Sequence, residues 1–247
     1  MTRDLRHGNR VRAVGLVIAG FTNAFQALVA EGAEKELRQA GLQLFIGSTD
    51  DDPGREPELA RAMIDRRVSA LMMMPDGDER GYLRAEHTFG TPVVLVGRPA
   101  NGLECDVVMT DDDRAVDEAT DQLLGLGHQR IAVLAGRASS FRAGQRLAGF
   151  RTALARHGVA EHPDLVTTGL GISAITRDPQ EIGRQAALLA MERIARPDGR
   201  PHTVTLPSVL VRRGSGELPP VRGMPRGTSQ TKVVTISADA GAERDAR

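Results

Sequence analysis

The sequence contains a single cysteine, Cys105, and lacks any run of the roughly 18 consecutive apolar residues that a membrane-spanning helix requires. One thiol excludes a disulfide within the chain and is compatible with a reducing compartment, so we expect a cytoplasmic protein with no membrane partner. An excess of charge of one sign is also missing, because 32 Lys and Arg residues balance 32 Asp and Glu residues. Without an overall positive field, the chain by itself is not expected to bind nucleic acid or an anionic lipid surface.

Recognisable catalytic and metal-binding motifs are absent as well. The sequence has no GxSxG nucleophile elbow and no Walker A loop, and its six histidines form no catalytic constellation. The glycines at 125–127 and 169–171 lack the strand-to-helix context of a dinucleotide fingerprint. The acidic triplets at 50–52 and 111–113 lack the spaced pattern of a calcium loop. We therefore predict no enzyme activity, no catalytic residue, no cofactor and no metal site.

What the sequence does contain is a regular alternation of short apolar runs and amphipathic stretches. The apolar runs predict strands at 13–19, 42–47, 68–74, 92–97, 106–110, 130–135 and 165–168, and the amphipathic stretches predict helices at 24–40, 56–66, 79–88, 113–125 and 141–157. Such a βαβ series predicts an α/β fold, in which a parallel sheet carries helices on both faces.

The first apolar run follows several arginines, an arrangement that a secretory signal would also show. We interpret it as mature structure instead. Val14 to Ala19 has the length of a strand, and the helical spacing that follows stays amphipathic as far as Gly41.

Six segments in a fixed order resemble one known family. The segment 123–154, which contains LGLGHQRIAVLAG and then RLAGFRTAL, resembles the effector-binding core of LacI/GalR-type bacterial transcriptional regulators. The segments VGLVIAGFTNAF at 14–25, GSTDDDPGREPELARAMIDRRVSALMMMP at 47–75 and TPVVLVGR at 91–98 match the same family at the expected relative positions. Near the end, ITRDPQEIGRQAALLAMERI and TLPSVLVRRGS resemble the last crossing helix and the closing strand of that family.

The resemblance implies a periplasmic-binding-protein-like type I fold, with two doubly wound parallel-sheet lobes. We expect the first lobe at 12–99, a crossover at 98–105 because Pro99 and Gly102 interrupt the periodicity there, and the second lobe at 100–213. The last residues, 214–247, are rich in Gly, Ser, Pro and charge and predict a mostly disordered tail.

Two regions depart from the pattern of the family. Only residues 1–11 precede the first strand, where full-length regulators of this type carry a helix-turn-helix domain, so we interpret them as an N-terminal remnant. At Gly169–Gly171 the sequence passes almost directly between segments that the family separates by several strands and helices. The second lobe is therefore expected to be incomplete, which would weaken ligand binding because each lobe supplies part of the polar shell.

Two candidate ligand-binding residues follow the first strand, where the loop resembles PDxxNPFF of the family. Phe25 would offer a flat apolar face to a sugar ring or a base, and the alternative is an ordinary core aromatic. Asn23 would contact the ligand, or it would simply cap the next helix. Gly20 stands where the family has an acid, and Gln26 replaces its second aromatic.

Two further candidates are acids that follow strands. Asp50 and Asp111 would accept hydrogen bonds from ligand hydroxyls, and helix capping is the alternative for both triplets. Asp111 matches the acid of the family motif DNxxG, but Asp112 stands in place of its Asn and Ala115 in place of its Gly.

Arg146 is the strongest candidate, because it matches the arginine of the family motif RxxGF. Its planar guanidinium would donate two hydrogen bonds into the cleft, and the alternative is a solvated helix arginine. Arg98, which follows the fourth strand and corresponds to the arginine of the family's DR pair, would face the cleft or pair with an acidic triplet.

The resemblance implies an effector-binding and dimerisation module of a LacI/GalR-type transcriptional regulator, such as a repressor. The expected partners are a sugar-like or nucleoside-like effector and a second copy of the chain, with DNA bound only through a domain missing here. Dimerisation is expected through helix 56–66, with Leu59, Ala62 and Met63 on one face, unless that face is buried in the monomer. The alternative function is that of a cytoplasmic solute-binding protein or an enzyme using the same cleft.

Overall fold

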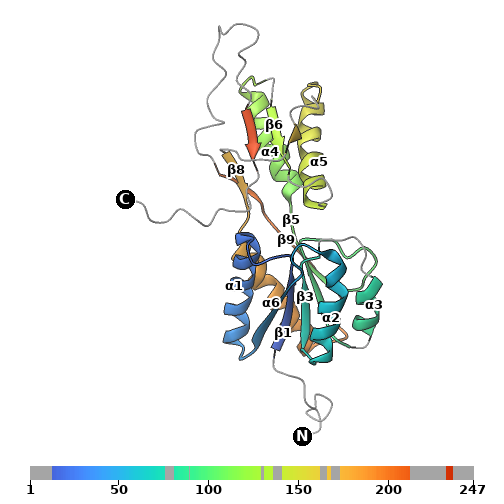
Figure 1. The fold of residues 1–247 in the computed structure, drawn as a ribbon. Helices are drawn as coiled ribbons and strands as arrows, with labels where there is room; N and C mark the ends of the chain where they lie inside the picture. The colour runs from blue at the N-terminus through green and yellow to red at the C-terminus, as the bar shows by residue number, and fades with distance from the viewer. Residues whose placement is uncertain are drawn as a thin grey trace. The chain divides into compact units, whose positions relative to one another are not determined.

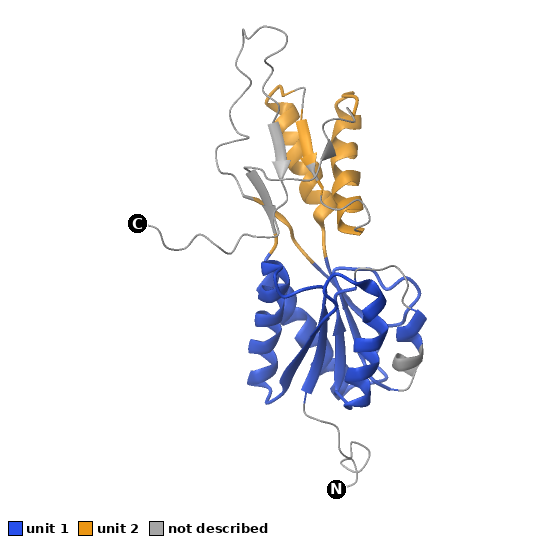
Figure 2. Ribbon diagram, in the orientation of Figure 1, with its two compact units in different colours: residues 1–109, 178–205 blue, residues 110–177, 206–247 orange. Residues whose placement is uncertain are grey.

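The computed structural model describes residues 13–75, 81–88, 90–128, 131–135, 141–161, 166–167, 173–211 and 232–235. The chain divides into two units (Figure 2), of which unit 1 comprises Met1–Met109 with Asp178–Thr205, and unit 2 comprises Thr110–Arg177 with Leu206–Arg247. The chain therefore passes from one unit to the other three times. No helix in the described ranges is both long and apolar enough to cross a bilayer.

Unit 1 is a six-stranded sheet with helices on both faces (Figure 1). Its elements are β1 (Ala13–Ile18), α1 (Ala24–Gln39), β2 (Gln43–Ser48), the 3-10 turn η2 (Pro53–Arg55), α2 (Glu56–Asp65), β3 (Ala70–Met73), α3 (Gly81–Thr88), β4 (Val93–Val96), β5 (Asp106–Thr110), α6 (Pro179–Ala195) and β9 (Thr203–Leu206). The strand order is β2-β1-β3-β4-β5-β9, and the pairs from β2 to β5 are parallel. Helices α1 and α6 lie on one face, and α2 and α3 lie on the other.

Local sequence explains where the two longest helices of unit 1 begin. The side chain of Asn23 accepts a hydrogen bond from the backbone N–H of Phe25 and so caps α1. Asp178 accepts from the backbone N–H of Glu181 and caps α6, and Pro179 supplies a φ already suited to a first helical turn. Both helices therefore start at residues that satisfy backbone donors left free by the helix.

Glycines allow α1 and α6 to pack with their backbones in contact. A Cβ on Gly32 would lie 2.0 Å from the backbone oxygen of Gln180, and one on Gly183 would lie 1.9 Å from that of Val29. No other residue type fits at either position without separating the helices. This contact brings α6, which is distant in sequence, into unit 1.

Unit 2 contains a five-stranded sheet and two long helices. Its elements are α4 (Asp112–Gly125), β6 (Ile131–Leu134), α5 (Phe141–Arg156), β7 (Val166–Thr167), β8 (Ser173–Thr176), β10 (Val209–Val211) and β11 (Lys232–Thr235). The strand order is β10-β8-β11-β6-β7, with β10 antiparallel to β8 and the other described pairs parallel. Phe150, Val116 and Val133 are fully or almost fully buried between α4, α5 and β6.

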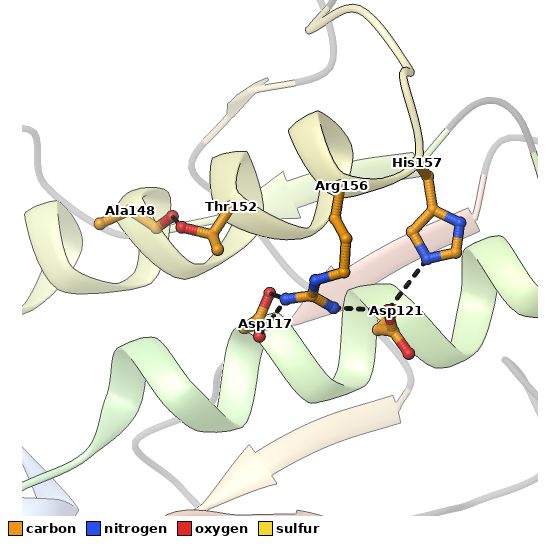
Figure 3. Close-up of polar contacts among 6 residues, drawn as sticks. All are labelled: Asp117, Asp121, Ala148, Thr152, Arg156 and His157. Atoms are coloured by element: carbon orange, nitrogen blue, oxygen red, sulfur yellow. Dashed lines mark hydrogen bonds and ion pairs between the residues drawn. The ribbon is translucent and has the colours of Figure 1, made fainter.

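Polar contacts join the end of α5 to the middle and second half of α4 at the surface (Figure 3). Arg156 donates hydrogen bonds to Asp117 and to Asp121, with Nη2–Oδ1 and Nη1–Oδ1 distances of 2.5 Å each. Nε2 of His157 lies 2.9 Å from the same Asp121 oxygen. These exposed contacts accompany the apolar packing of the two helices.

The observed units differ from the predicted lobes. Unit 1 does not end at residue 99 but continues through β5 and takes back Asp178–Thr205, and the predicted crossover at 98–105 instead joins β4 to β5 inside unit 1. A buried ion pair helps to explain this, because Arg193 on α6 donates from Nε and Nη2 to the two carboxylate oxygens of Asp106 on β5, both at 2.9 Å. The prediction failed because this contact joins segments far apart in the sequence.

The prediction of a disordered tail is wrong for Lys232–Thr235. This segment forms β11, which lies between β6 and β8 and pairs with both. The strand predicted at 130–135 consequently has a neighbour on each side within the sheet, although the second lobe was expected to leave it poorly covered. The proposed remnant at 1–11 and most of the predicted tail lie outside the described residues.

Candidate functional site

A polar cluster in unit 2 is organised around Asp112, a fully buried residue in the first turn of α4. Its Oδ2 atom accepts hydrogen bonds from Nε of Arg146 and from Nη1 of Arg177, each at 3.1 Å. Its Oδ1 atom accepts from the hydroxyl of Ser208 at 2.8 Å. Two arginines and a serine thus share one carboxylate.

These partners come from separate parts of the chain. Arg146 lies on α5, Arg177 directly follows β8, and Ser208 directly precedes β10. Arg177 and Ser208 are also close to two of the positions at which the chain passes between the units. Asp112 therefore ties together the segments of unit 2 that lead into those crossings.

The electrostatics of the cluster follow from its burial. Burial raises the pKa of Asp112, but the charges of Arg177 and Arg146 and hydrogen bonds from Ser208 and Thr110 outweigh it, so the pKa lies below its ordinary value. For Arg177, burial lowers the pKa to about 9, although Asp112 acts in the opposite direction. The surroundings thus stabilise the charged form of Asp112, whereas burial destabilises the charged form of Arg177.

Arg146 lies where the sequence predicted a ligand-binding arginine. Its Nη1 atom donates to the backbone oxygen of Ala135, just beyond the carboxyl end of β6, at 3.0 Å. Its Nε atom is held by Asp112, and its Nη2 atom makes no hydrogen bond to any residue that the structure describes. The side chain is only 10% exposed, so the alternative of a solvated helix arginine is wrong. As far as the described residues go, the Nη2 donor of this fixed guanidinium is left for a further hydrogen-bond acceptor.

Asp111 precedes this cluster and is engaged on both carboxylate oxygens. Its Oδ1 atom accepts from the backbone N–H of Ser208 at 2.6 Å, and its Oδ2 atom lies 2.7 Å from Nε of Arg114. It occupies the N-cap position of α4 but makes no capping hydrogen bond. The capping alternative is therefore wrong for Asp111, which holds the segment before β10 against the start of α4.

The candidates in the first loop of unit 1 match their alternative interpretations. Asn23 caps α1, as described above, and Phe25 is a core residue with only 4% exposure. The exposed aromatic of this loop is Phe21, at 59%, which the sequence analysis did not single out. Its place between the buried strand and the helix cap is the signal that would have found it.

The remaining candidates lie at the carboxyl edge of the unit 1 sheet. Asp50 is exposed and accepts from Nη1 of Arg55 at 3.1 Å, so its carboxylate has a partner within its own loop. Arg98 is buried, and its Nε atom donates to the backbone oxygen of Pro75 at 3.1 Å. Arg98 thus links the ends of β3 and β4.

The structure therefore brings together Arg146, Asp111 and the neighbouring Asp112 in unit 2, whereas Asn23, Phe25, Asp50 and Arg98 belong to unit 1. Sequence reasoning missed Arg177 and Ser208, and it considered Asp112 only as part of the acidic triplet and as a substitution in the family motif. Their grouping depends on contacts such as Arg177 with Asp112, which lie 65 residues apart in the sequence. Among the described residues, no group of three or more His, Cys, Asp or Glu side chains is placed to hold a metal ion.

Comparison with known proteins identifies the family. A sequence profile described as "Periplasmic binding proteins and sugar binding domain of LacI family" matches residues 11–173, which is most of the chain. The chain belongs to this family. HTH-type transcriptional regulator DegA of Bacillus subtilis (strain 168) is 27% identical over 191 residues, which are 76% of this chain and 55% of that protein. The sucrose operon repressor of Klebsiella pneumoniae is 32% identical over 171 residues, which are 68% of this chain and 49% of that protein.

Solved structures of the LacI family share the fold. The crystal structure of a putative ribose operon repressor from Burkholderia thailandensis superposes with a TM-score of 0.75 at 22% identity and covers 82% of this chain and 99% of that one. The periplasmic-binding-protein-like α/β fold predicted from the sequence is thereby confirmed. The chain spans about half the length of the curated relatives it matches, and those relatives are transcriptional regulators.

Proposed function

We propose that this chain is the effector-binding part of a LacI-type transcriptional regulator and that its effector is a sugar. The observation that carries the proposal is the guanidinium of Arg146, which Asp112 and the backbone of Ala135 hold in one orientation while its Nη2 atom bonds to no described residue. A fixed planar donor at the carboxyl end of a parallel strand suits recognition of hydroxyl oxygens. The description of the family and the name of the sucrose operon repressor support a sugar.

Calorimetric titration of the 247-residue chain with a panel of monosaccharides and disaccharides tests this proposal. We expect at least one sugar to bind, and we expect Arg146→Ala to weaken it by about tenfold or more, since hydrogen bonds to charged groups contribute roughly 1.5–3 kcal/mol. Arg151→Ala is the matched control, because Arg151 lies on the same helix and pairs with Glu161 at the surface. Binding that survives Arg146→Ala unchanged would overturn the assignment of the site.

We further propose that regulation involves DNA contact by a separate domain of the whole protein and that this chain supplies effector binding and dimerisation. The balance of acidic and basic residues supports this division, because specific DNA binding relies on a local excess of positive charge. In a mobility-shift assay at physiological salt, the 247-residue chain should give no sequence-selective retardation. Selective retardation at nanomolar protein would contradict the division.

The edge strand β2 is the surface that we propose for the homodimer. Phe45 and Ile46 are 36% and 38% exposed on this edge. The helix face expected to mediate dimerisation is less suitable, because Met63 is buried and packs against Gly15 and Gly47 of the same unit. An edge strand with exposed apolar side chains is a surface that proteins normally cover.

Sedimentation velocity of two matched variants tests this surface. Ile46→Asp should weaken the dimer by about tenfold or more, because it places a charge in an apolar contact. Val209→Asp, which alters an exposed apolar residue of unit 2, should leave the dimer intact. A monomeric wild-type chain at tens of micromolar, or a dimer insensitive to Ile46→Asp, would show that β2 is not the interface.

A further inference from the structure

The strand β11 occupies a central position in the sheet of unit 2. The strand order β10-β8-β11-β6-β7 places it between β6 and β8, and it runs parallel to both. Val234 is paired on each side, with Val133 of β6 and with Ser173 of β8. Neighbouring strands lie about 4.8 Å apart, so β11 holds β6 and β8 about 10 Å from each other.

The carboxyl ends of these two flanking strands carry the supports of Arg146. Ala135 directly follows β6, and its backbone oxygen accepts a hydrogen bond from Nη1 of Arg146 at 3.0 Å. Arg177 directly follows β8, and its Nη1 atom donates to Oδ2 of Asp112 at 3.1 Å. The same oxygen accepts from Nε of Arg146 at 3.1 Å. A chain of contacts thus runs from the end of β6, through Arg146 and Asp112, to the end of β8.

This chain of contacts fits one separation of β6 and β8. A side-chain hydrogen bond is lost once its donor and acceptor are more than about 3.5 Å apart. Without β11, the two strands would close toward a single spacing of about 4.8 Å or move apart, because the backbone groups that β11 pairs would need other partners. Either movement exceeds what the contacts of Arg146 can follow.

We propose that β11 positions the effector site, and that effector binding and the pairing of β11 stabilise each other. The proposal rests on the function proposed above, because it takes Arg146 to be an effector contact. Paired β11 keeps Ala135 and Arg177 at the separation that orients the guanidinium of Arg146. By thermodynamic linkage, a bound effector then favours paired β11 by the same factor. The pairing with β8 extends, within the described ranges, over Val234 and Thr235, and such a short pairing opens locally at little cost.

Proline substitution in β11 tests the first half of the proposal. Val234→Pro removes a backbone N–H from a strand that is paired on both sides, so it should release β11. Val234→Ala is the matched control, because it shortens the side chain and keeps that N–H. In calorimetric titrations of the full chain with the panel of monosaccharides and disaccharides, Val234→Pro should bind at least about tenfold more weakly than wild type. Val234→Ala should bind with nearly the wild-type affinity.

The proline variant has a clear contrary outcome. If the amides of 232–235 exchange freely in Val234→Pro and the sugar still binds with wild-type affinity, the inference is overturned and the sugar site stands. Thr235→Pro, at the last position of β11, takes the place of Val234→Pro if that variant does not fold.

Amide hydrogen exchange of the wild-type chain tests the reciprocal effect. Saturating sugar should slow the exchange of the amides at 232–235 by at least about tenfold, because both equilibria share one coupling free energy. Amides of β2 are the control, since β2 is an edge strand of unit 1 and is not part of the polar cluster. Slower exchange in β6 without any change at 232–235 would show that the effector does not act on β11.

A signal of Arg146 separates failure of this inference from failure of the proposed function. In an isotope-labelled chain, the Nε–H of Arg146 donates to the buried Asp112 and should exchange slowly with water, and Arg146→Lys identifies its NMR signal by removing it. Val234→Pro should speed this exchange by at least about tenfold, and Val234→Ala should not. If no sugar binds the wild-type chain, the proposed function fails, and this rate still decides whether β11 positions Arg146. An exchange rate that Val234→Pro leaves unchanged contradicts the inference.

Discussion

Asp112 is the residue on which the polar cluster of unit 2 depends. It is fully buried, and its carboxylate accepts hydrogen bonds from Arg146, Arg177 and the hydroxyl of Ser208. Asp112→Ala should therefore destabilise the chain by about 3–5 kcal/mol, because it leaves buried guanidinium groups without this counter-ion. Urea unfolding measures the change, with Asp113→Ala as the control, since Asp113 is the next residue along α4 and is exposed.

The free energy of unfolding measured at acidic pH provides a second test of the same residue. The folded-state pKa of Asp112 lies below its ordinary value of 3.8, so its charge stabilises the fold above that value. This contribution is lost as the pH falls from 3.8 through the folded pKa. The difference in stability between wild type and Asp112→Ala should accordingly shrink at low pH. A difference that stays constant down to pH values below the folded pKa would contradict the paired state of Asp112.

Residue-level prediction from the sequence succeeded where the signal was local or lay in a motif. Asn23 could be recognised as a possible helix cap, and Arg146 could be singled out by its match to the RxxGF motif. The role of Phe25 was left open, because an amphipathic helix presents the same pattern whether its aromatic faces the core or a ligand. Arg177 gave no local signal, since its position beside Asp112 depends on how β8 and α4 come together.

At the scale of elements, the close backbone contact between α1 and α6 leads to a specific prediction about the stability of a Gly183 variant. A Cβ on Gly183 would meet the backbone oxygen of Val29 at 1.9 Å and the backbone nitrogen of Ala33 at 2.8 Å, and backbone atoms cannot move aside cheaply. Gly183→Ala should destabilise the chain by roughly 1–3 kcal/mol, even though alanine favours the helix by about 0.5–1 kcal/mol. Thermal or urea unfolding measures this.

Gly144 is the matched control for that substitution. It lies in α5, and a Cβ there would have nothing within 4 Å. Gly144→Ala should therefore stabilise the chain by about 0.5–1 kcal/mol through helix propensity alone. If Gly183→Ala were as stabilising as Gly144→Ala, α1 and α6 could not pack as closely as described.

The elements themselves were largely predictable because apolar periodicity is a local property. The predicted strand at 106–110 and helix at 141–157 agree with β5 and α5 to within a residue at each end. The assignment of elements to units was not predictable in the same way. Asp106 pairs with Arg193 across 87 residues of sequence, and β11 pairs with β6 from within a segment whose composition indicated disorder.

At the scale of the whole molecule, each unit has a sheet of its own, and two of the three crossings between them lie close in sequence to Arg177 and Ser208. The central claim is that Arg146, held by Asp112, is an effector contact. A crystal structure of the chain with the tightest-binding sugar or sugar derivative tests this most directly. The account predicts a ligand oxygen within hydrogen-bond distance of Nη2 of Arg146 while Nε remains on Asp112. A ligand bound elsewhere, with Arg146 untouched, would contradict it.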